Sequence, residues 1–492
     1  MLGVLMKKYF KQIVAASVLA YAFFFASRPI TDPDFWFHLK TGEYITQNGI
    51  IPKTDLFSFT SFGKPWVAHE WLSGVIFYAI YSSTGLNVLI LVFAIVTVLA
   101  FWIAFTSADV HVFIKGFSLL LSVWTVVPAI GVRPRVFTLL FASIYLTLLS
   151  AYGRRGKGRA VWWLVPLMIV WANLHAGFLI GLVLIALTIV GMLLDAWASG
   201  ENIRSLYPRL LTLVAVLLGC LLAAIVNPHG TRIYFFPFEI FFSQVQQQLV
   251  TDWFSPDFHD PTFFPLGLLI LLTIAALGLS ARRPRPSELL LLLTTLYATL
   301  KSSRHLAIFA LVAGPLLAGY VQAWLASTSY REPFARPPSP KSTGQTVLLT
   351  AVLLLPLAVF IPKLRTTVYS PPRQEIVSVP INAVEYLKEK QIEGNTLTDP
   401  NIWGDYLIWA LPANPVYIDG RIDMYGDQFV KEYLDLTWAI TDWRGLFGRY
   451  GVRVAIVRPK SPLNRQLKES TDWLQVFEDG MAVVFTKLDP PK

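Results

Sequence analysis

The sequence contains little charge and a single cysteine. Only 15% of its 492 residues are charged, whereas 54% are hydrophobic. A soluble chain of this length would carry more charge, so the composition indicates a polytopic membrane protein. The lone Cys220 lies inside an apolar run, which excludes disulfides within the chain and a metal site built on thiolates.

The net charge of +10 points to the membrane and not to a nucleic-acid partner. Lys and Arg gather in short loops between apolar runs, at 153–159, 281–286 and 331–342, and such loops are expected on the cytoplasmic side. The first apolar segment follows several lysines and is interpreted as an uncleaved anchor, although a cleaved signal peptide has a similar pattern. The chain is therefore expected to emerge outside the cytoplasm near Arg28.

Apolar runs that approach the length needed to cross a bilayer, about 20 residues, recur up to residue 362. They predict an all-α membrane domain of about twelve transmembrane helices over residues 1–362. The run at 71–84 is short, and a half-span and a surface helix both fit it. The runs lie near 12–28, 71–84, 86–106, 112–130, 136–152, 161–176, 178–198, 210–226, 263–280, 288–302, 304–325 and 344–362.

Residues 363–492 have a different character, because charge returns and apolar runs shorten to strand length. The pattern predicts an amphipathic helix at 382–392, buried strands at 415–421 and 452–459, and a hairpin over 473–487. Alternating helices and strands predict a small α/β domain. It is expected outside the cytoplasm, because the loop before the last span is basic.

Ionisable residues cluster directly after the first apolar run, in the stretch TDPDFWFHLKTGEYI at 31–45. The simplest interpretation is a helix start, with Asp32 as the N-cap and Asp34 favoured by the helix dipole. On such a helix His38 lies on the face of Asp34, and Lys40 lies on a neighbouring face. The stretch therefore predicts a helix on the outer membrane surface that presents a carboxylate and a histidine.

The aromatic residues of this stretch, Phe35, Trp36 and Phe37, suit the lipid interface. A second polar cluster, GKPWVAHEW at 63–71, brings His69 and Glu70 to the start of the next apolar run. Loop 29–70 is thus either a solvated loop with interfacial aromatics or part of a site.

Further polar side chains in apolar surroundings favour a site, a polar cavity near one membrane face whose cations can hold phosphate. They are Arg133, Arg135, Asn173, His175, His229, Lys301, Arg304 and His305.

A large first extracytoplasmic loop that opens with an acidic motif after the first span resembles the GT-C superfamily, membrane glycosyltransferases that use lipid-linked sugar donors. The spacing from Asp34 to Gly49 is similar to that in the loop helix of protein O-mannosyltransferases and aminoarabinose transferases. His69-Glu70-Trp71 resembles their next polar motif, although the His-Pro-Pro of the former is missing. HLKTGE, HEWL and IDGR-D-YG also look like stretches of a group of uncharacterised bacterial membrane proteins.

The resemblance implies inverting transfer of a sugar from a polyprenyl-phosphate donor to an extracytoplasmic acceptor, which is a glycan, a lipid or a protein. It implies a protein of the cytoplasmic membrane whose active site and C-terminal domain face outward. The catalytic candidates are Asp34, as the base, and Asp32. The candidates for binding the donor phosphate are Arg304, His305, Arg133 and Arg135.

The residues are also compatible with a metal site and with an acceptor contact. A divalent cation, magnesium or manganese, could bridge Asp34 and His69 or Glu70. Within WGDYLIWALPANPVYIDGRIDMYGDQF at 403–429, Arg421 and Asp423 follow a predicted strand and could hold the acceptor. An ion pair from Arg421 that only ties the strand end in place is the alternative.

Other functions are compatible with this composition. A carrier or flippase for lipid-linked glycans would use residues 363–492 as a recognition module, and a glycan polymerase or ligase would share donor and location. Transporters usually have internal repeats and broken spans at mid-membrane. No repeat is visible, and the polar clusters lie at span ends, which favours the glycosyltransferase.

Overall fold

The computed structural model describes residues 2–155, 158–328 and 379–488, together with residues 354, 355, 358 and 362. The chain forms two compact units. Unit 1 consists of Met1–Pro29, Asn87–Gly230 and Asp252–Ser370. Unit 2 consists of Ile30–Leu86, Thr231–Thr251 and Pro371–Lys492. The segment between the first two helices and the C-terminal region therefore belong to the same unit.

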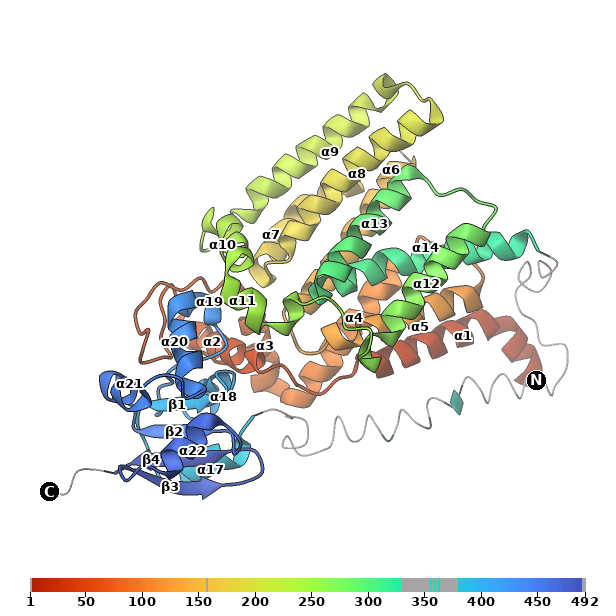
Figure 1. The fold of residues 1–492 in the computed structure, drawn as a ribbon. Coiled ribbons are helices and arrows are strands. Elements are labelled where there is room, and N and C mark those ends of the chain that lie inside the picture. The colour runs from red at the N-terminus through yellow and green to blue at the C-terminus, as the bar shows by residue number, and fades with distance from the viewer. Residues whose placement is uncertain are drawn as a thin grey trace. The chain divides into compact units, whose positions relative to one another are not determined.

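Helices are the regular secondary structure of the described residues of unit 1, and Figure 1 shows the long ones. Its long helices are α1 (Leu2–Ala26), α4 (Leu86–Phe105), α5 (Val112–Val126), α6 (Arg135–Arg155), α7 (Leu164–Leu174), α8 (Phe178–Ser199), α9 (Ile203–Ala224), α12 (Phe264–Leu279), α13 (Pro286–Lys301) and α14 (Leu306–Ala326). Short 3-10 turns are η1 (Val127–Ala129), η2 (Arg159–Trp163), η3 (Thr251–Trp253), η4 (Pro261–Phe263) and η5 (Ser303–His305).

Seven helical segments of the described residues are long and apolar enough to cross a membrane. They are Leu86–Phe105, Val112–Ala129, Arg135–Arg154, Phe178–Ser199, Ile203–Ala224, Pro261–Leu279 and Ser303–Ala326, and the segments Lys11–Ala26 and Arg159–Leu174 are shorter. A multi-pass helical membrane protein is thus confirmed, whereas the number of about twelve spans stays a prediction. The predicted run at 344–362 and the basic loop at 331–342 lie outside the described residues, apart from four single positions.

Close helix contacts in unit 1 depend on small side chains. Helix α5 packs against α1, α12 and α14, and Figure 1 shows these helices beside one another. A methyl group on Gly314 of α14 would come within 2.1 Å of Ser122 Oγ on α5. Small residues at membrane helix interfaces allow this approach and favour packing without any hydrophobic driving force between the helices.

Unit 2 is built from helices and one small sheet. Its helices are α2 (Asp34–Asn48), α3 (Trp71–Thr84), α10 (Arg232–Phe242), α11 (Gln244–Leu249), α17 (Ile381–Glu389), α18 (Trp403–Ala410), α19 (Ile422–Tyr425), α20 (Asp427–Thr437), α21 (Trp443–Tyr450) and α22 (Pro462–Lys468). Helix α3 has 14 residues, which is below the length of a full span. Helix α2 packs against both α3 and α18.

The sheet of unit 2 contains β1 (Thr396–Asp399), β2 (Val454–Val457), β3 (Trp473–Glu478) and β4 (Val483–Lys487) in the order β1-β2-β4-β3. Strand β1 is parallel to β2, and the other pairs are antiparallel. Both β1 and β2 are fully buried, as parallel strands usually are. The predicted α/β character of this region is therefore confirmed.

One predicted strand is wrong. Residues 415–421 form no strand, and only Val416 makes isolated bridges, to Ser58 and to Thr396. Val416, Tyr417 and Ile418 are nevertheless fully buried, so the apolar run marks the core and not a regular strand. The amphipathic helix appears as α17, the strand at 452–459 as β2, and the hairpin over 473–487 as β3 and β4.

Candidate functional site

Helix α2 begins at Asp34, one residue later than the sequence predicts. Pro33 takes the N-cap position with φ −65° and makes no side-chain cap. The Asp34 amide donates a hydrogen bond to Asp32 Oδ1 at 3.3 Å, so Asp32 still supplies an oxygen to the helix start. Asp34 lies in the first turn, where the helix dipole favours a negative charge.

The prediction that Phe35 and Trp36 lie at the lipid interface is wrong. Their exposed fractions are 1% and 3%. Phe35 stacks on Phe77 of α3 with 5.7 Å between ring centroids, and Trp36 meets Tyr406 of α18 edge-on at 5.0 Å. These aromatic contacts fix α2 between α3 and α18, and so determine where Asp34 lies.

Asp34 and Asp405 meet at the backbone of Gly420. A methyl group on Gly420 would lie 2.5 Å from Asp405 Oδ2 and 2.6 Å from Asp34 Oδ1, so these two oxygens are within about 5 Å of each other. Asp405 is fully buried, and its Oδ1 accepts a hydrogen bond from the Gly420 amide at 2.9 Å. Its Oδ2 has no hydrogen-bond partner in the part of the chain that the structure describes. Asp34 is only half-buried.

The surroundings of Asp405 favour the neutral form of its carboxyl group. Burial raises the pKa of Asp405 well above its ordinary value, and the negative charges of Asp34 and Asp419 raise it further. The Gly420 amide and Arg421 oppose this shift with smaller effects. A neutral acid beside a carboxylate is the arrangement that separates acid and base roles. Asp34 is therefore the member of the pair suited to carry the charge and to accept a proton.

A partly buried charge cluster joins α2 to the start of α3. Glu70 Oε2 lies 3.0 Å from His38 Nε2, and Glu70 Oε1 lies 3.5 Å from His69 Nε2. Burial raises the pKa of Glu70, but the two histidines outweigh it and hold that pKa well below its ordinary value. Burial lowers the pKa of His69, but Glu70 and Asp423 outweigh it, so the net shift is upward. Burial raises the pKa of Asp423, and His69 opposes that shift. The predicted site residues of this cluster thus interact electrostatically. They are His38, His69, Glu70 and Asp423.

Arg421 is buried in a network of ion pairs. Its guanidinium lies 2.6 Å from Asp419 Oδ2 and 2.7 Å from Asp55 Oδ1, with the Trp66 ring 4.5 Å away. Tyr425 donates its hydroxyl hydrogen to Asp419 Oδ2 at 2.7 Å. Burial lowers the pKa of Arg421, and these anionic neighbours outweigh it and raise that pKa well above its ordinary value. The geometry supports the interpretation of Arg421 as a tie between chain segments, and its contact with an acceptor stays a prediction.

Lys40, another predicted site residue, is engaged on α2 itself. Its Nζ lies 2.5 Å from Glu43 Oε2 and 6.0 Å from the centre of the Trp409 ring. Lys40 therefore joins α2 to α18.

Three of the four predicted phosphate-binding residues gather around Asp252 in unit 1. Arg135 forms an ion pair with Asp252. Burial raises the pKa of Asp252, but the charges of Arg135, Arg133 and Arg304 outweigh it and lower that pKa. Arg304 also lies 3.6 Å from the Trp253 ring. Three guanidinium groups against one carboxylate leave an excess of positive charge, which suits a phosphate. His305 ends the same turn η5 as Arg304.

The sequence interpretation missed three carboxylates, at Asp55, Asp252 and Asp405. Asp405 is the most informative, because it lies in the apolar stretch WGDYLIWA and is fully buried. A carboxyl group inside an apolar run is costly to bury and so is a signal of function. Asp34, near which it lies, is distant in the chain, so the pairing itself leaves no sequence pattern.

A metal-binding cluster is not present among residues 2–155, 158–328 and 379–488. They contain no group of three or more His, Cys, Asp or Glu side chains that could hold a metal ion. A divalent cation that bridges Asp34 and His69 or Glu70 therefore stays a prediction.

No family model and no curated protein sequence matches this chain. Solved structures do match its fold. The archaeal oligosaccharyltransferase AglB from Archaeoglobus fulgidus, in complex with an inhibitory peptide and a dolichol-phosphate, is 11% identical with a TM-score of 0.56. The match covers 92% of this chain and 70% of AglB.

Two further structures share this fold. ArnT from Cupriavidus metallidurans bound to undecaprenyl phosphate is 15% identical with a TM-score of 0.53, over 99% of both chains. The mycobacterial arabinofuranosyltransferase AftD is 15% identical with a TM-score of 0.51, over 98% of this chain and 41% of AftD. The fold that the resemblance to membrane glycosyltransferases predicts is therefore confirmed as a fold.

Proposed function

We propose that this protein is an inverting membrane glycosyltransferase that takes a sugar from a polyprenyl-phosphate donor. The observation that carries the proposal is the half-buried Asp34 at the start of α2, paired with the buried Asp405, in a chain that shares its fold over 99% of its length with ArnT. That structure is bound to undecaprenyl phosphate, and the AglB structure contains a dolichol-phosphate. A lipid phosphate is accordingly the donor class we assign to this chain.

In the proposed reaction Asp34 acts as the general base. An acceptor hydroxyl oxygen attacks the anomeric carbon of the sugar, and the bond from that carbon to the phosphate oxygen breaks. The phosphate leaves with the bonding electron pair, and the hydroxyl proton passes to Asp34. Attack opposite to the leaving group inverts the anomeric configuration. The neutral carboxyl of Asp405 leaves Asp34 as the charged member of the pair before transfer.

The leaving phosphate needs positive charge, and the cluster of Arg133, Arg135 and Arg304 is our candidate to supply it. Guanidinium groups bind phosphate oxygens through paired hydrogen bonds and stay charged at all working pH values. We place the reaction at the cytoplasmic membrane, on its extracytoplasmic side, from the distribution of basic loops. Asp423, half-buried beside His69, is the candidate we retain for contact with the acceptor.

The test uses the full chain in lipid nanodiscs with a radiolabelled undecaprenyl-phosphate sugar and a membrane extract as acceptor. Wild-type protein is expected to release undecaprenyl phosphate and to transfer label. Asp34→Asn keeps the size of the side chain but removes the basic carboxylate, so transfer is expected to fall about 10²–10⁴-fold while donor binding is retained. Asp32→Asn, which changes only the helix start, is the matched control and should cost at most ~1–2 kcal/mol of stability.

Two outcomes would contradict the proposal. Equal transfer by wild type and Asp34→Asn would remove Asp34 from the role of base. Donor binding without transfer, combined with movement of labelled lipid across the bilayer of proteoliposomes, would favour the carrier instead.

A further inference from the structure

A small apolar pocket lies between three helices of unit 1. Its volume is about 80 Å³, and its wall includes Ala15 and Leu19 of α1, Trp102 of α4, and Leu119 of α5. Lys115 of α5 is the charged residue of this wall. The volume is roughly half that of an engineered cavity of 150 Å³ that accommodates a benzene ring. The pocket can therefore take a few methylene groups but no sugar ring with its hydroxyls.

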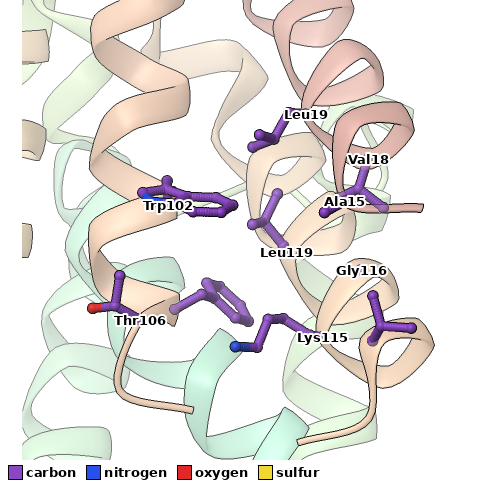
Figure 2. A pocket seen from close by; sticks show the side chains of 10 residues that line it. Ala15, Val18, Leu19, Trp102, Thr106, Lys115, Gly116 and Leu119 are labelled. Carbon is purple, nitrogen blue, oxygen red and sulfur yellow. The ribbon is translucent and has the colours of Figure 1, made fainter. Parts of the chain in front are cut away.

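Lys115 brings a positive charge to this apolar wall. Figure 2 shows its side chain extending across one end of the pocket toward the side of Thr106. Lys115 is half-buried, and among the described residues no hydrogen bond or ion pair to its ammonium group is found. The exposed Asp109 attracts it without closing an ion pair among those residues. A charge in this position is favourable where an anion lies at the mouth of the pocket.

The pocket lies at the end of unit 1 that is expected to face the cytoplasm. It combines the middle of α1 with the end of α4 and the start of α5, which follow one another in the chain. Lys11 precedes Ala15 by one helical turn, and Lys7 and Lys8 precede it in the sequence. Basic residues at this end of the first span indicate the cytoplasmic side. Anionic lipids are enriched in the cytoplasmic leaflet, where they attract such basic segments.

We propose that this pocket binds one acyl chain of an anionic phospholipid of the cytoplasmic leaflet, with the lipid phosphate at Lys115. The apolar wall accepts part of an acyl chain, and the phosphate supplies the charge that complements Lys115 and Lys11. A branched polyprenyl chain is wider than a saturated acyl chain, and the narrow pocket favours the latter. The site is separate from the proposed reaction and does not depend on it.

The test measures lipid retention by the purified full chain with native mass spectrometry. Phosphatidylglycerol and phosphatidylethanolamine with the same acyl chains are offered in equal amounts. Wild type is expected to retain one phosphatidylglycerol with about fivefold preference, the effect of one basic residue near an anionic headgroup. Lys115→Gln should abolish this preference, and Lys115→Arg should keep it. Arg283→Gln removes an exposed charge in another loop of unit 1 and is the matched control, which should behave as wild type.

A second variant tests the acyl chain independently of charge. Ala15→Phe fills the pocket and leaves Lys115 in place, so it should reduce retention of both lipids at this site. Thermal unfolding in lipid-free detergent identifies variants that are misfolded. The proposal is overturned by an unchanged preference in Lys115→Gln, by an equal loss in Arg283→Gln, or by undecaprenyl phosphate displacing phosphatidylglycerol at this site.

Discussion

Gly420 is the residue at which the candidate active site is most tightly determined. Its amide donates to Asp405, and the carboxylate oxygens of both Asp405 and Asp34 approach the place that a side chain at this position would occupy. The absence of a side chain is thus what allows the two carboxyl groups to share one small volume. The proton transfer we propose depends on that proximity. The two carboxyl groups affect each other's protonation only at short range.

Gly420→Ala is expected to reduce transfer about 10²-fold while most of the protein stays folded. The added methyl group would lie 2.5 Å from Asp405 Oδ2 and 2.6 Å from Asp34 Oδ1, so at least one carboxyl group has to move. A displacement of about 1 Å at a reacting group can reduce the rate about 10²-fold. The measurement is label transfer from an undecaprenyl-phosphate sugar, together with thermal unfolding.

Gly448→Ala, on α21 of the same unit, is the control for Gly420→Ala. No atom lies within 4 Å of the position its methyl group would take, so activity and stability should be unchanged. Wild-type activity in Gly420→Ala would show that the approach of Asp34 and Asp405 to Gly420 has no part in the reaction.

Individual site residues could be predicted from the sequence, whereas the residues that they contact could not. Local spacing placed Asp34 in the first turn of a helix, and the structure confirms that position. The same spacing could not predict that His38 pairs with Glu70, because that contact depends on how two helices cross. Aromatic composition suggested lipid contact for Trp36, whereas α18, from a remote part of the sequence, covers that side chain. Pairings between distant segments are tertiary information and leave no local pattern.

Among the elements, the crossing of α2 and α3 depends on two glycines. A methyl group on Gly42 would come within 2.0 Å of the Gly74 carbonyl oxygen, and one on Gly74 within 2.7 Å of the His38 carbonyl oxygen. The helices therefore approach each other through backbone atoms. This crossing also brings His38 to Glu70, the residue directly before α3.

Gly42→Ala is expected to destabilise the protein by ~1–3 kcal/mol, the usual cost of overpacking. The clash is with backbone atoms, which cannot turn away as the end of a side chain can. A fall in the midpoint of thermal unfolding in detergent is the measurement. Gly278→Ala, in α12 with no atom within 4 Å, is the control and should be as stable as wild type or more so. An unchanged midpoint in Gly42→Ala would show that α2 and α3 can separate without cost.

The sequence predicted most of the elements, because hydropathy over a span is a strong local signal. The boundaries of α4, α8 and α14 agree with the predicted runs within a few residues. Residues 415–421 were mistaken for a strand, since short apolar runs reveal burial without revealing whether a neighbouring strand pairs with them. The prediction of a domain boundary after residue 362 falls next to residues outside the described ranges and stays a prediction.

For the whole molecule, unit 2 shows that the first loop and the C-terminal region fold together. Asp55 of the loop pairs with Arg421, and Asp34 approaches Asp405. Two segments that share a buried ion pair have to lie on the same side of a membrane. The first loop and the C-terminal region therefore face the same side of the membrane. A labelled position in the loop shows on which side both of them lie.

Labelling of introduced cysteines tests this orientation in sealed right-side-out vesicles with a membrane-impermeant maleimide. Asn48→Cys, at an exposed position at the end of α2, should be labelled without permeabilisation, because the basic loops predict that unit 2 faces outward. Arg283→Cys, exposed between α12 and α13, should be labelled only after permeabilisation. The native Cys220 is fully buried and gives little background. Labelling of Asn48→Cys only after permeabilisation would reverse the topology, and it would place Asp34 and the proposed transfer on the cytoplasmic side.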